Sequence, residues 1–306
     1  MEFFSVDRLV EQKLVKGCPF PLLILPMDVS KKDPESLASA IHKNRQWLDD
    51  CLLQCRAMLF RGFELNNALD FDKIVKAFGY REHKYEAGED ERETVVGRVL
   101  TVNFSSSVLL SFHNEMAYLD SYPDILMFFC DVEPAVGGNT PIVSGLRVLE
   151  RMTQEWPDFV AKLREKGVTY VKYYEAKDKD KAIARSERTT STTLEFLPDG
   201  RVIETFVPRS GIAKEVGSGL EVFFNSMAVV YLWKGTHKLC FGDGSEMPVE
   251  ALDAYLRILD EEKVSFQWKK GDVLVLDNIA TMHAREKFKP PRLILASLCN
   301  RTTVAA

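Results

Sequence analysis

The sequence predicts a β-rich α+β protein in which a sandwich or barrel of strands carries helices on its outside. Many short apolar segments are separated by turn residues such as Pro198-Asp199-Gly200, a pattern typical of strands in antiparallel sheets. The regular alternation of strand and helix that marks a parallel α/β sheet is missing from the sequence. The 306 residues can form two average domains or one large β-rich domain.

The N-terminal region, about residues 33–80, is expected to be helical. Asp33 can cap a helix over residues 33–56, because apolar residues recur behind it at helical spacing. A second, shorter helix is expected at about residues 71–78. Between the two, residues 57–63 form an apolar segment that favours a strand ending in a turn.

The rest of the chain is expected to consist mainly of strands, with two further helices. Residues 125–132 are too few for a comfortable helix and are rich in side chains that pack in sheets. Residues 248–262 carry apolar side chains on one helical face, which predicts an amphipathic helix. The other expected helix is 156–166, and the other expected strands are 94–104, 168–174, 193–197, 202–207, 220–224, 264–268, 272–276 and 293–298.

The segment of about residues 175–192 is expected to be a lid-like insertion. Its first part, residues 175–188, is a dense mixture of basic and acidic side chains. Charge runs are most often solvated surfaces, but surface loops also close over functional sites. We therefore interpret this segment as a solvated loop or a lid.

Composition and charge exclude several classes of protein. Hydrophobic residues make up 46% of the chain and charged residues 28%, which are ordinary values for a globular protein and not those of a disordered one. The 40 basic and 45 acidic side chains give a net charge of -5, so no overall positive field favours nucleic acid or an anionic membrane. We expect a small-molecule ligand as the partner, with no nucleic acid and no membrane, and the oligomeric state stays open.

The cysteines and the N-terminus predict a cytoplasmic protein. The six cysteines are scattered, and no two of them form a C-x-x-C pair. The longest clear apolar run, residues 19–26, is far shorter than the roughly 20 residues that span a bilayer. The first residues also lack the pattern of a secretory signal. We therefore expect a reducing compartment and free thiols.

His113 and Glu115 are the first candidate metal ligands. They follow an apolar stretch and stand two residues apart, so in an extended chain their side chains point to the same face. With a second histidine they would form a facial triad of two histidines and one carboxylate, which binds Fe(II) and leaves other positions open. The pair alone is weak evidence, because a histidine and an acid at this spacing also meet by chance. The histidines expected to be surface, helix-face or loop residues are His42, His83 and His237.

His283 and Arg292 are the next candidates, in the last third of the chain. His283 comes after a buried strand and a turn, where a second strand would begin and could return it beside the first pair. Arg292 opens an otherwise apolar strand, and an unpaired buried charge is costly. The arginine therefore predicts an anionic ligand, and a carboxylate would satisfy its fork of donors.

In their order and spacing, five blocks of the sequence resemble the Fe(II)- and 2-oxoglutarate-dependent dioxygenases of the taurine dioxygenase type, and most closely the plant clavaminate synthase-like proteins. The blocks cover most of the chain; they are residues 59–63, 112–117, 137–143, 224–227, and 268–272 continued through 277–278 to 283–285. The resemblance implies a single dioxygenase domain over residues 1–306. It also implies a double-stranded β-helix, or jelly-roll, core with peripheral helices.

The resemblance further implies a set of cofactors and the residues that bind them. His113, Glu115 and His283 match the iron ligands of the family. Thr140 matches the threonine that hydrogen-bonds 2-oxoglutarate, and Arg292 matches the arginine that pairs with its far carboxylate. The implied cofactors are Fe(II), 2-oxoglutarate as co-substrate, and O2. The implied reaction oxidises a C–H bond of a small organic molecule, usually by hydroxylation, and releases succinate and CO2; desaturation, cyclisation or epoxidation would use the same residues.

Three positions bear on the substrate. Taurine-type members place a second arginine four residues after the first, and this position is Ala296 here, which disfavours an anion anchored at that point. Arg285 could supply the charge from another direction, or it could form a surface salt bridge. Asn225, which follows a strand in one of the matching blocks, is a candidate substrate or cofactor contact, with a satisfied turn residue as the alternative.

Other functions fit parts of the same pattern. A zinc-dependent hydrolase could use the same three ligands, but it would leave Thr140 and Arg292 without a role. A non-catalytic jelly-roll binding protein would be expected to have a broken triad, and this triad is intact. A dioxygenase that acts on protein or nucleic acid also stays open, although the acidic charge does not favour nucleic acid.

Overall fold

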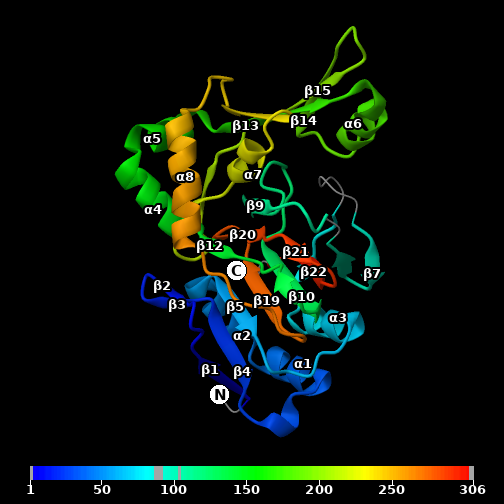
Figure 1. Ribbon diagram of the computed structural model, residues 1–306. Coiled ribbons are helices and arrows are strands. Elements are labelled where there is room, and N and C mark those ends of the chain that lie inside the picture. Colours follow the sequence, from blue (N-terminus) through cyan, green and yellow to red (C-terminus); the bar gives the residue numbers. More distant parts are fainter. Residues whose placement is uncertain (1–2, 86–91, 103–104, 303–306) are drawn as a thin grey trace.

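A large sheet runs through the centre of the molecule (Figure 1). The computed structural model describes residues 3–85, 92–102 and 105–302. Among these residues the sheet has nine strands in the order β1-β4-β5-β19-β10-β22-β8-β7, with β6 also paired to β22. Its strands are β1 (Phe4–Asp7), β4 (Leu22–Pro26), β5 (Ala57–Phe60), β6 (Arg81–Glu82), β7 (Thr94–Val96), β8 (Val99–Thr101), β10 (Ile125–Val132), β19 (Val273–Asp277) and β22 (Leu293–Asn300).

The central strand β10 is buried on both faces, which explains its unbroken apolar sequence. Successive side chains of a strand point to opposite faces. Accordingly Met127 and Phe129 pack into one hydrophobic core, while Leu126 and Phe128 pack into another. The first core is covered by three helices, α1 (Pro34–Lys43), α2 (Arg45–Cys55) and α3 (Ala68–Ala77). The second core lies on the opposite face of the large sheet.

A smaller sheet packs over this second core. It has the order β12-β20-β9, from β12 (Ile142–Ser144), β20 (Thr281–Arg285) and β9 (Leu110–His113). The ring of Phe128 on the large sheet lies 5.2 Å from the ring of His283 on the small one. Two facing sheets of this kind form a double-stranded β-helix, so the predicted fold class is confirmed.

Helices and a further sheet surround the small sheet. A four-stranded sheet has the order β14-β15-β13-β18 and lies at the top of Figure 1. Its strands are β13 (Val168–Tyr174), β14 (Thr192–Phe196), β15 (Val202–Phe206) and β18 (His237–Phe241). The helices of this part are α4 (Gly145–Glu155), α5 (Pro157–Lys166), α6 (Lys179–Ser186), α7 (Met227–Leu232) and α8 (Val249–Glu262). The remaining short elements are β2 (Lys13–Val15), β3 (Cys18–Phe20), β11 (Val136–Gly137), β16 (Ile212–Lys214), β17 (Glu221–Phe223), β21 (Phe288–Lys289), η1 (Val29–Lys31) and η2 (Ala176–Asp178).

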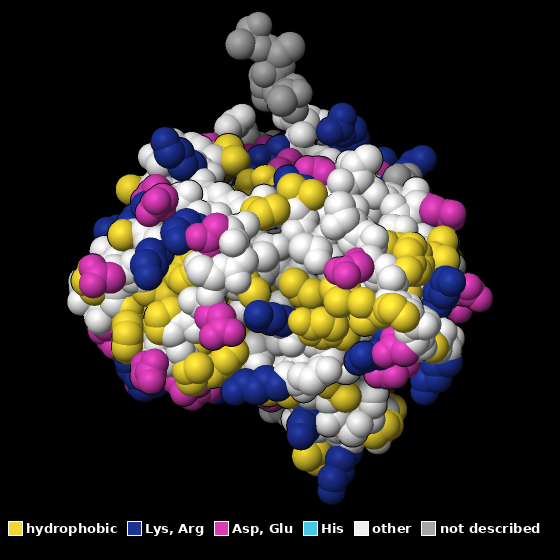
Figure 2. Space-filling view, turned by 90° about the horizontal axis from the view of Figure 1, so that it is seen from above, with side chains coloured by type: hydrophobic (Ala, Val, Ile, Leu, Met, Phe, Trp, Pro, Cys, Tyr) yellow, Lys and Arg dark blue, Asp and Glu magenta, His cyan; other side chains and the backbone are white. Residues whose placement is uncertain are grey.

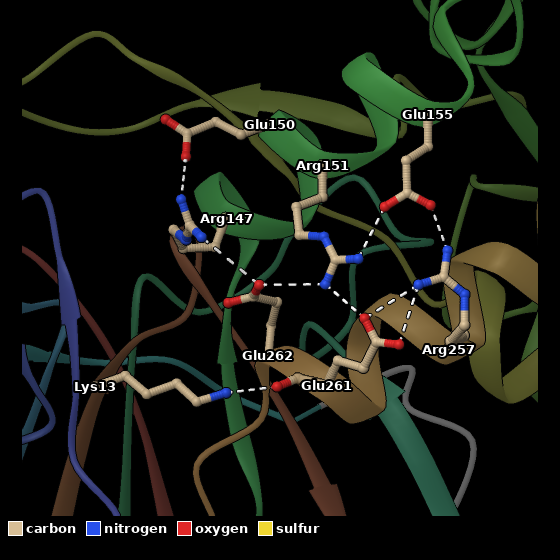
Figure 3. A network of polar contacts seen from close by, with 8 residues as sticks. All are labelled: Lys13, Arg147, Glu150, Arg151, Glu155, Arg257, Glu261 and Glu262. Carbon is tan, nitrogen blue, oxygen red and sulfur yellow. Dashed lines mark hydrogen bonds and ion pairs between the residues drawn. The ribbon is translucent and has the colours of Figure 1, made fainter.

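A network of ion pairs joins α4 to α8 (Figure 3). Arg151 on α4 contacts Glu155 on its own helix and Glu261 near the end of α8. Arg257 on α8 also contacts Glu155, which closes the network. Isolated surface pairs contribute little, but a network holds its members in place more firmly. The network therefore helps to hold α8 in place. This helix carries the buried Tyr255, whose hydroxyl donates to the side chain of Asn225.

The expected helix over residues 33–56 is wrong as one piece, because the chain breaks at Asn44. The backbone there leaves the helical region, with φ -108° and ψ 21°, and the Asn44 side chain donates to the carbonyl of Ala40, 2.8 Å away. This amide ends α1, and α2 begins at the next residue. Asparagine competes in this way for backbone groups near helix ends.

Three other expectations also need correction. Residues 264–268 are not a strand: Val264 makes one bridge to Ile142, and the apolar pattern reflects burial of Phe266 and Trp268 instead. The charged segment 175–188 is largely helical, because it contains η2 and α6 rather than an irregular loop. His237 begins a strand instead of lying in a loop. The expected strand at residues 94–104 is found as β7 and β8, and its residues 103 and 104 lie outside the described residues.

Two findings concern the expected compartment. The six cysteines carry free thiols. Within the described ranges, no helix combines the length and the apolar composition that crossing a membrane requires.

Candidate active site

The small sheet brings His113, Glu115 and His283 together. His113 ends β9, and His283 lies directly opposite it on the neighbouring strand β20. The two rings are 4.3 Å apart between centroids, and His283 Nε2 lies 3.8 Å from a Glu115 oxygen. One candidate ligand atom from each residue lies within 4.8 Å of the others. Residues 170 positions apart in the sequence thus form one cluster that can hold a metal ion.

The surroundings of both histidines favour the neutral imidazole, which is the form that binds a metal. Burial lowers the pKa of His113, although the nearby Glu115 raises it in part. Burial also lowers the pKa of His283 well below its ordinary value, and the neighbouring His113 and Arg92 add to the effect. The Nδ1 atom of His113 lies 2.8 Å from the carbonyl of Ser111. Because a carbonyl only accepts, Nδ1 carries the proton and Nε2 offers its lone pair. These donors fit Fe(II), which favours two imidazoles and one carboxylate.

Asn278 and Asn114 fix the backbone that carries Glu115. The Asn278 amide accepts from the Glu115 N–H at 2.8 Å and donates to the Glu115 carbonyl at 3.1 Å. The Asn114 amide in turn donates to the carbonyl of Asn278 at 2.6 Å. Both asparagines are fully buried. The sequence places Asn278 in a matching block but gives no sign of this role, which depends on a contact 163 residues away along the chain.

Replacing Asn278 with alanine is expected to weaken Fe(II) binding by about 10- to 100-fold, the usual cost of removing a group that orients a metal ligand. The exposed Asn66 provides the matched control, Asn66→Ala, for which we expect unchanged affinity. Anaerobic titration with Fe(II) measures both. Equal affinity of Asn278→Ala and the parent protein would show that the amide does not position Glu115.

Thr140 and Arg292 contact each other in the wall of a cavity that the three ligands also line. Arg292 Nη2 donates to Thr140 Oγ1 at 3.3 Å, and its Nε donates to the carbonyl of Gly138 at 2.7 Å. The indole of Trp268 also donates to Thr140 Oγ1, at 3.1 Å. Burial lowers the pKa of Arg292 to about 10, and the nearby Arg285 contributes. A partly buried guanidinium is suited to pair with a carboxylate.

This arginine cavity, named for Arg285 and Arg292, encloses about 580 Å³ including its opening. Its lining includes His113, Glu115, His283, Thr140, Arg285 and Arg292. The cavity therefore presents three metal ligands together with a threonine and an arginine. A short dicarboxylate with a metal-chelating end, such as 2-oxoglutarate, fits this arrangement of charges.

Arg285 and Asn225 are the two candidate substrate contacts, and Arg285 lines the arginine cavity. Arg285 is buried, and its Nη2 donates to the carbonyls of Ser105 and Val108, so the alternative of a surface salt bridge is wrong. Asn225 is buried. It lines neither of the two cavities at the ligands, and its side chain donates to the carbonyl of Gly211 and accepts from Tyr255. Its amide supports the framework instead.

A second cavity opens beside two of the ligands, His113 and Glu115. This aromatic cavity encloses about 670 Å³ including its opening. It shares Arg92, Leu110, His113 and Glu115 with the arginine cavity. Its other lining residues are mainly aromatic or apolar; they are Tyr85, Met116, Tyr118, Tyr170, Phe206, Ser226, Val229, Val230, Trp233 and His237. A largely apolar and aromatic lining of this kind is typical of small-molecule sites.

Arg92 lies between the two cavities, and sequence reasoning missed it. Its Nη2 donates to both oxygens of Glu115, at 2.9 and 3.0 Å. Burial would lower the pKa of Arg92, but the charge of Glu115 raises it above its ordinary value. The guanidinium also lies 4.5 Å from the centre of the Tyr85 ring. Arg92 is embedded in a run of charged residues, and such runs are usually solvated.

The fold and the cluster define an iron- and 2-oxoglutarate-dependent oxygenase. Residues 24–298 match the model of the family described as taurine catabolism dioxygenase TauD, TfdA family. The chain belongs to this family, and its cofactors are Fe(II), 2-oxoglutarate and O2. The alternatives of a zinc hydrolase and a non-catalytic binding protein are not supported.

Individual relatives agree with this assignment. A clavaminate synthase-like protein of Arabidopsis thaliana is 37% identical over 317 residues, which cover 94% of this chain and 96% of the relative. The structure of PvcB, an Fe, α-ketoglutarate dependent oxygenase from an isonitrile synthetic pathway, is similar with a TM-score of 0.57 at 15% identity, covering 98% of this chain and 92% of that one. A taurine dioxygenase from Burkholderia xenovorans has a TM-score of 0.56 at 16% identity, covering 98% and 90%. These two structures show the fold.

Proposed function

We propose that this chain hydroxylates a C–H bond of a small organic molecule held in the aromatic cavity. His113, Glu115 and His283 would hold Fe(II), while Thr140 and Arg292 would bind 2-oxoglutarate in the arginine cavity. The observation that carries the proposal is that the two cavities meet at two of the three ligands, His113 and Glu115. Together, iron, 2-oxoglutarate and O2 supply the oxidant: one oxygen atom enters succinate, the other enters the substrate, and CO2 leaves.

The residues around the ligands would position both reactants and exclude water. Arg292 and Thr140 would fix the far carboxylate of 2-oxoglutarate, so that its other end faces the histidines. The rings of Tyr170 and Phe206 would confine the substrate beside the ligands, since both are buried in the wall of the aromatic cavity. Such confinement selects the target carbon and protects a reactive site from solvent.

A small-molecule substrate and a cytoplasmic site of action belong to the same proposal. On the face drawn in Figure 2, basic and acidic side chains are interspersed, and hydrophobic side chains form separate groups between them. This pattern and the net charge of -5 favour a small molecule over nucleic acid. The free thiols favour a reducing compartment.

An anaerobic titration tests the cofactor sites. Metal-free protein receives Fe(II) and then 2-oxoglutarate, and the weak visible charge-transfer band of an iron-bound keto acid is recorded. We expect one 2-oxoglutarate per chain to produce the band, and Zn(II) to produce none. On admission of O2, a screen of small molecules that follows succinate is expected to identify the substrate. Iron binding without a band would contradict the proposal.

A further inference from the structure

We propose that Trp268 is a positioning residue for 2-oxoglutarate: its indole N–H, together with Arg292, turns the hydroxyl proton of Thr140 toward the far carboxylate of the co-substrate. The inference rests on the proposed function, because it concerns how the same site holds 2-oxoglutarate. It gives a specific role to a buried tryptophan in residues 264–268, a segment that the sequence pattern indicates only as a strand. Its support comes from the directions of the hydrogen bonds at Thr140, the donors of Arg292 and the anchoring of the chain around Trp268.

The two hydrogen bonds at the Thr140 hydroxyl can each run in one direction only. Trp268 Nε1 lies 3.1 Å from Thr140 Oγ1, and an indole nitrogen can only donate. Arg292 Nη2 lies 3.3 Å from the same oxygen, and a guanidinium also can only donate. The hydroxyl oxygen therefore accepts twice, which uses both of its lone pairs. Its own proton has to be donated to a third group.

The co-substrate supplies this third group. Among the described residues, Thr140 Oγ1 makes no hydrogen bond besides the two that it accepts. Thr140 is 4% exposed and lines the arginine cavity, so an anion in this cavity can accept its proton. A hydroxyl that turned freely would point a lone pair at the anion part of the time, which is repulsive. With both lone pairs occupied, this orientation is excluded and Thr140 acts as a donor.

Arg292 keeps donors for the carboxylate after its contact with Thr140. Its Nε donates to the carbonyl of Gly138 at 2.7 Å, and one hydrogen of Nη2 is directed to Thr140. Within the described parts of the chain, Nη1 and the second hydrogen of Nη2 stay available. Two such parallel donors match the two oxygens of a carboxylate. The far carboxylate would therefore meet two N–H groups of Arg292 and the O–H group of Thr140.

The place of the indole is fixed by the chain on both sides of it. Trp268 is fully buried. Arg61 Nη2 donates to the carbonyl of Gln267 at 2.8 Å and to Asp272 at 2.6 Å. Asp272 in turn accepts from the N–H of Lys269 at 2.8 Å. These bonds tie the residues directly before and after Trp268 to the ends of β5 and β19. The indole N–H thus keeps its position, and the Thr140 hydroxyl adapts to it.

A double-mutant cycle between Trp268 and Thr140 tests this role. Trp268→Phe removes the N–H and keeps an aromatic ring, whereas Thr140→Val removes the hydroxyl and keeps the shape. The full chain is loaded anaerobically with Fe(II) and titrated with 2-oxoglutarate, and affinity is read from the charge-transfer band. We expect Trp268→Phe to weaken 2-oxoglutarate binding about 3- to 10-fold, the effect of one hydrogen bond, and to leave Fe(II) affinity unchanged. In a chain that already carries Thr140→Val, Trp268→Phe is expected to have no further effect on 2-oxoglutarate affinity, because the hydroxyl that it orients is gone.

A second tryptophan provides the matched control. Trp47 packs on the ring of Phe4 in the core on the other face of the large sheet, and we expect Trp47→Phe to keep the parent affinity for 2-oxoglutarate. Thermal unfolding of the metal-free variants records any loss of stability separately. If Trp268→Phe does not fold, 3-benzothienylalanine introduced at position 268 takes its place in the cycle, because it has nearly the shape of tryptophan with sulfur instead of the N–H.

Two results would overturn the inference. One is the parent affinity for 2-oxoglutarate in Trp268→Phe. The other is an equal loss of affinity when Trp268→Phe is added to the parent protein and to Thr140→Val, which is what a purely structural role of the ring predicts. The band formed by the parent protein reports on the proposed function separately. A parent protein that forms the band, with no coupling between the two positions, therefore contradicts only the inference.

Discussion

Replacing His283 with alanine is expected to abolish stoichiometric Fe(II) binding. The imidazole is one of only three protein groups that converge on the proposed ion position in the described structure. Loss of a direct ligand should exceed the roughly 10- to 100-fold effect of losing a group that merely orients one. Metal content after anaerobic loading and desalting, together with the charge-transfer band, measures the loss.

Two variants complete the experiment on His283. His113→Ala should behave in the same way, because His113 lies opposite His283 on the paired strand. His42→Ala is the matched control, since His42 is exposed on α1 and far from the cluster in the sequence. Thermal unfolding of the metal-free proteins separates loss of a ligand from loss of the fold. Tight iron retention in both His113→Ala and His283→Ala would place the ligands elsewhere.

The sequence was sufficient to predict those site residues whose side-chain chemistry is distinctive. His113, Glu115 and His283 suit a metal, and Arg292 is a charge at the start of an apolar strand. The structure brings all four to one cavity. Arg92 could not be found in this way, because nothing in a run of charged residues shows which member turns inward. Its role depends on a contact with Glu115, 23 residues away.

The fold was predictable where local pattern and burial agree. The strand expected at residues 125–132 and the strand expected at 168–174 have the observed bounds. Residues 264–268 show the opposite case. Their apolar side chains are buried, but the backbone makes only one strand-like bridge. The hydrophobic pattern alone therefore gave a wrong prediction of a strand. Helix α4 was also missed, although its apolar residues 146, 149 and 152 recur at helical spacing.

Replacing Arg292 with alanine is expected to weaken 2-oxoglutarate binding by about 30- to 1,000-fold and to leave Fe(II) affinity within a few-fold of the parent value. Truncating one partner of a buried charge pair costs about 2–4 kcal/mol, which corresponds to this range. Arg285 lines the same cavity and can partly replace the lost positive charge. We therefore expect the loss of 2-oxoglutarate affinity to fall near the lower end of this range. Titration of the charge-transfer band with 2-oxoglutarate measures the change, and Arg201→Ala, at an exposed turn, is the control.

A glycine beside Arg292 tests the same site without removing a charge. Gly138 has a φ of +73°, and a Cβ added there would lie 2.8 Å from Arg292 Cδ and 2.9 Å from Phe288 Cβ. Gly219 has a similar φ of +69° but open space around it. Both alanine variants therefore bear a similar backbone strain of about 1 kcal/mol, but only Gly138→Ala must displace the guanidinium. We expect weaker 2-oxoglutarate binding in Gly138→Ala and none of this effect in Gly219→Ala. If both Arg292→Ala and Gly138→Ala bind 2-oxoglutarate with the parent affinity, the co-substrate does not use the arginine cavity.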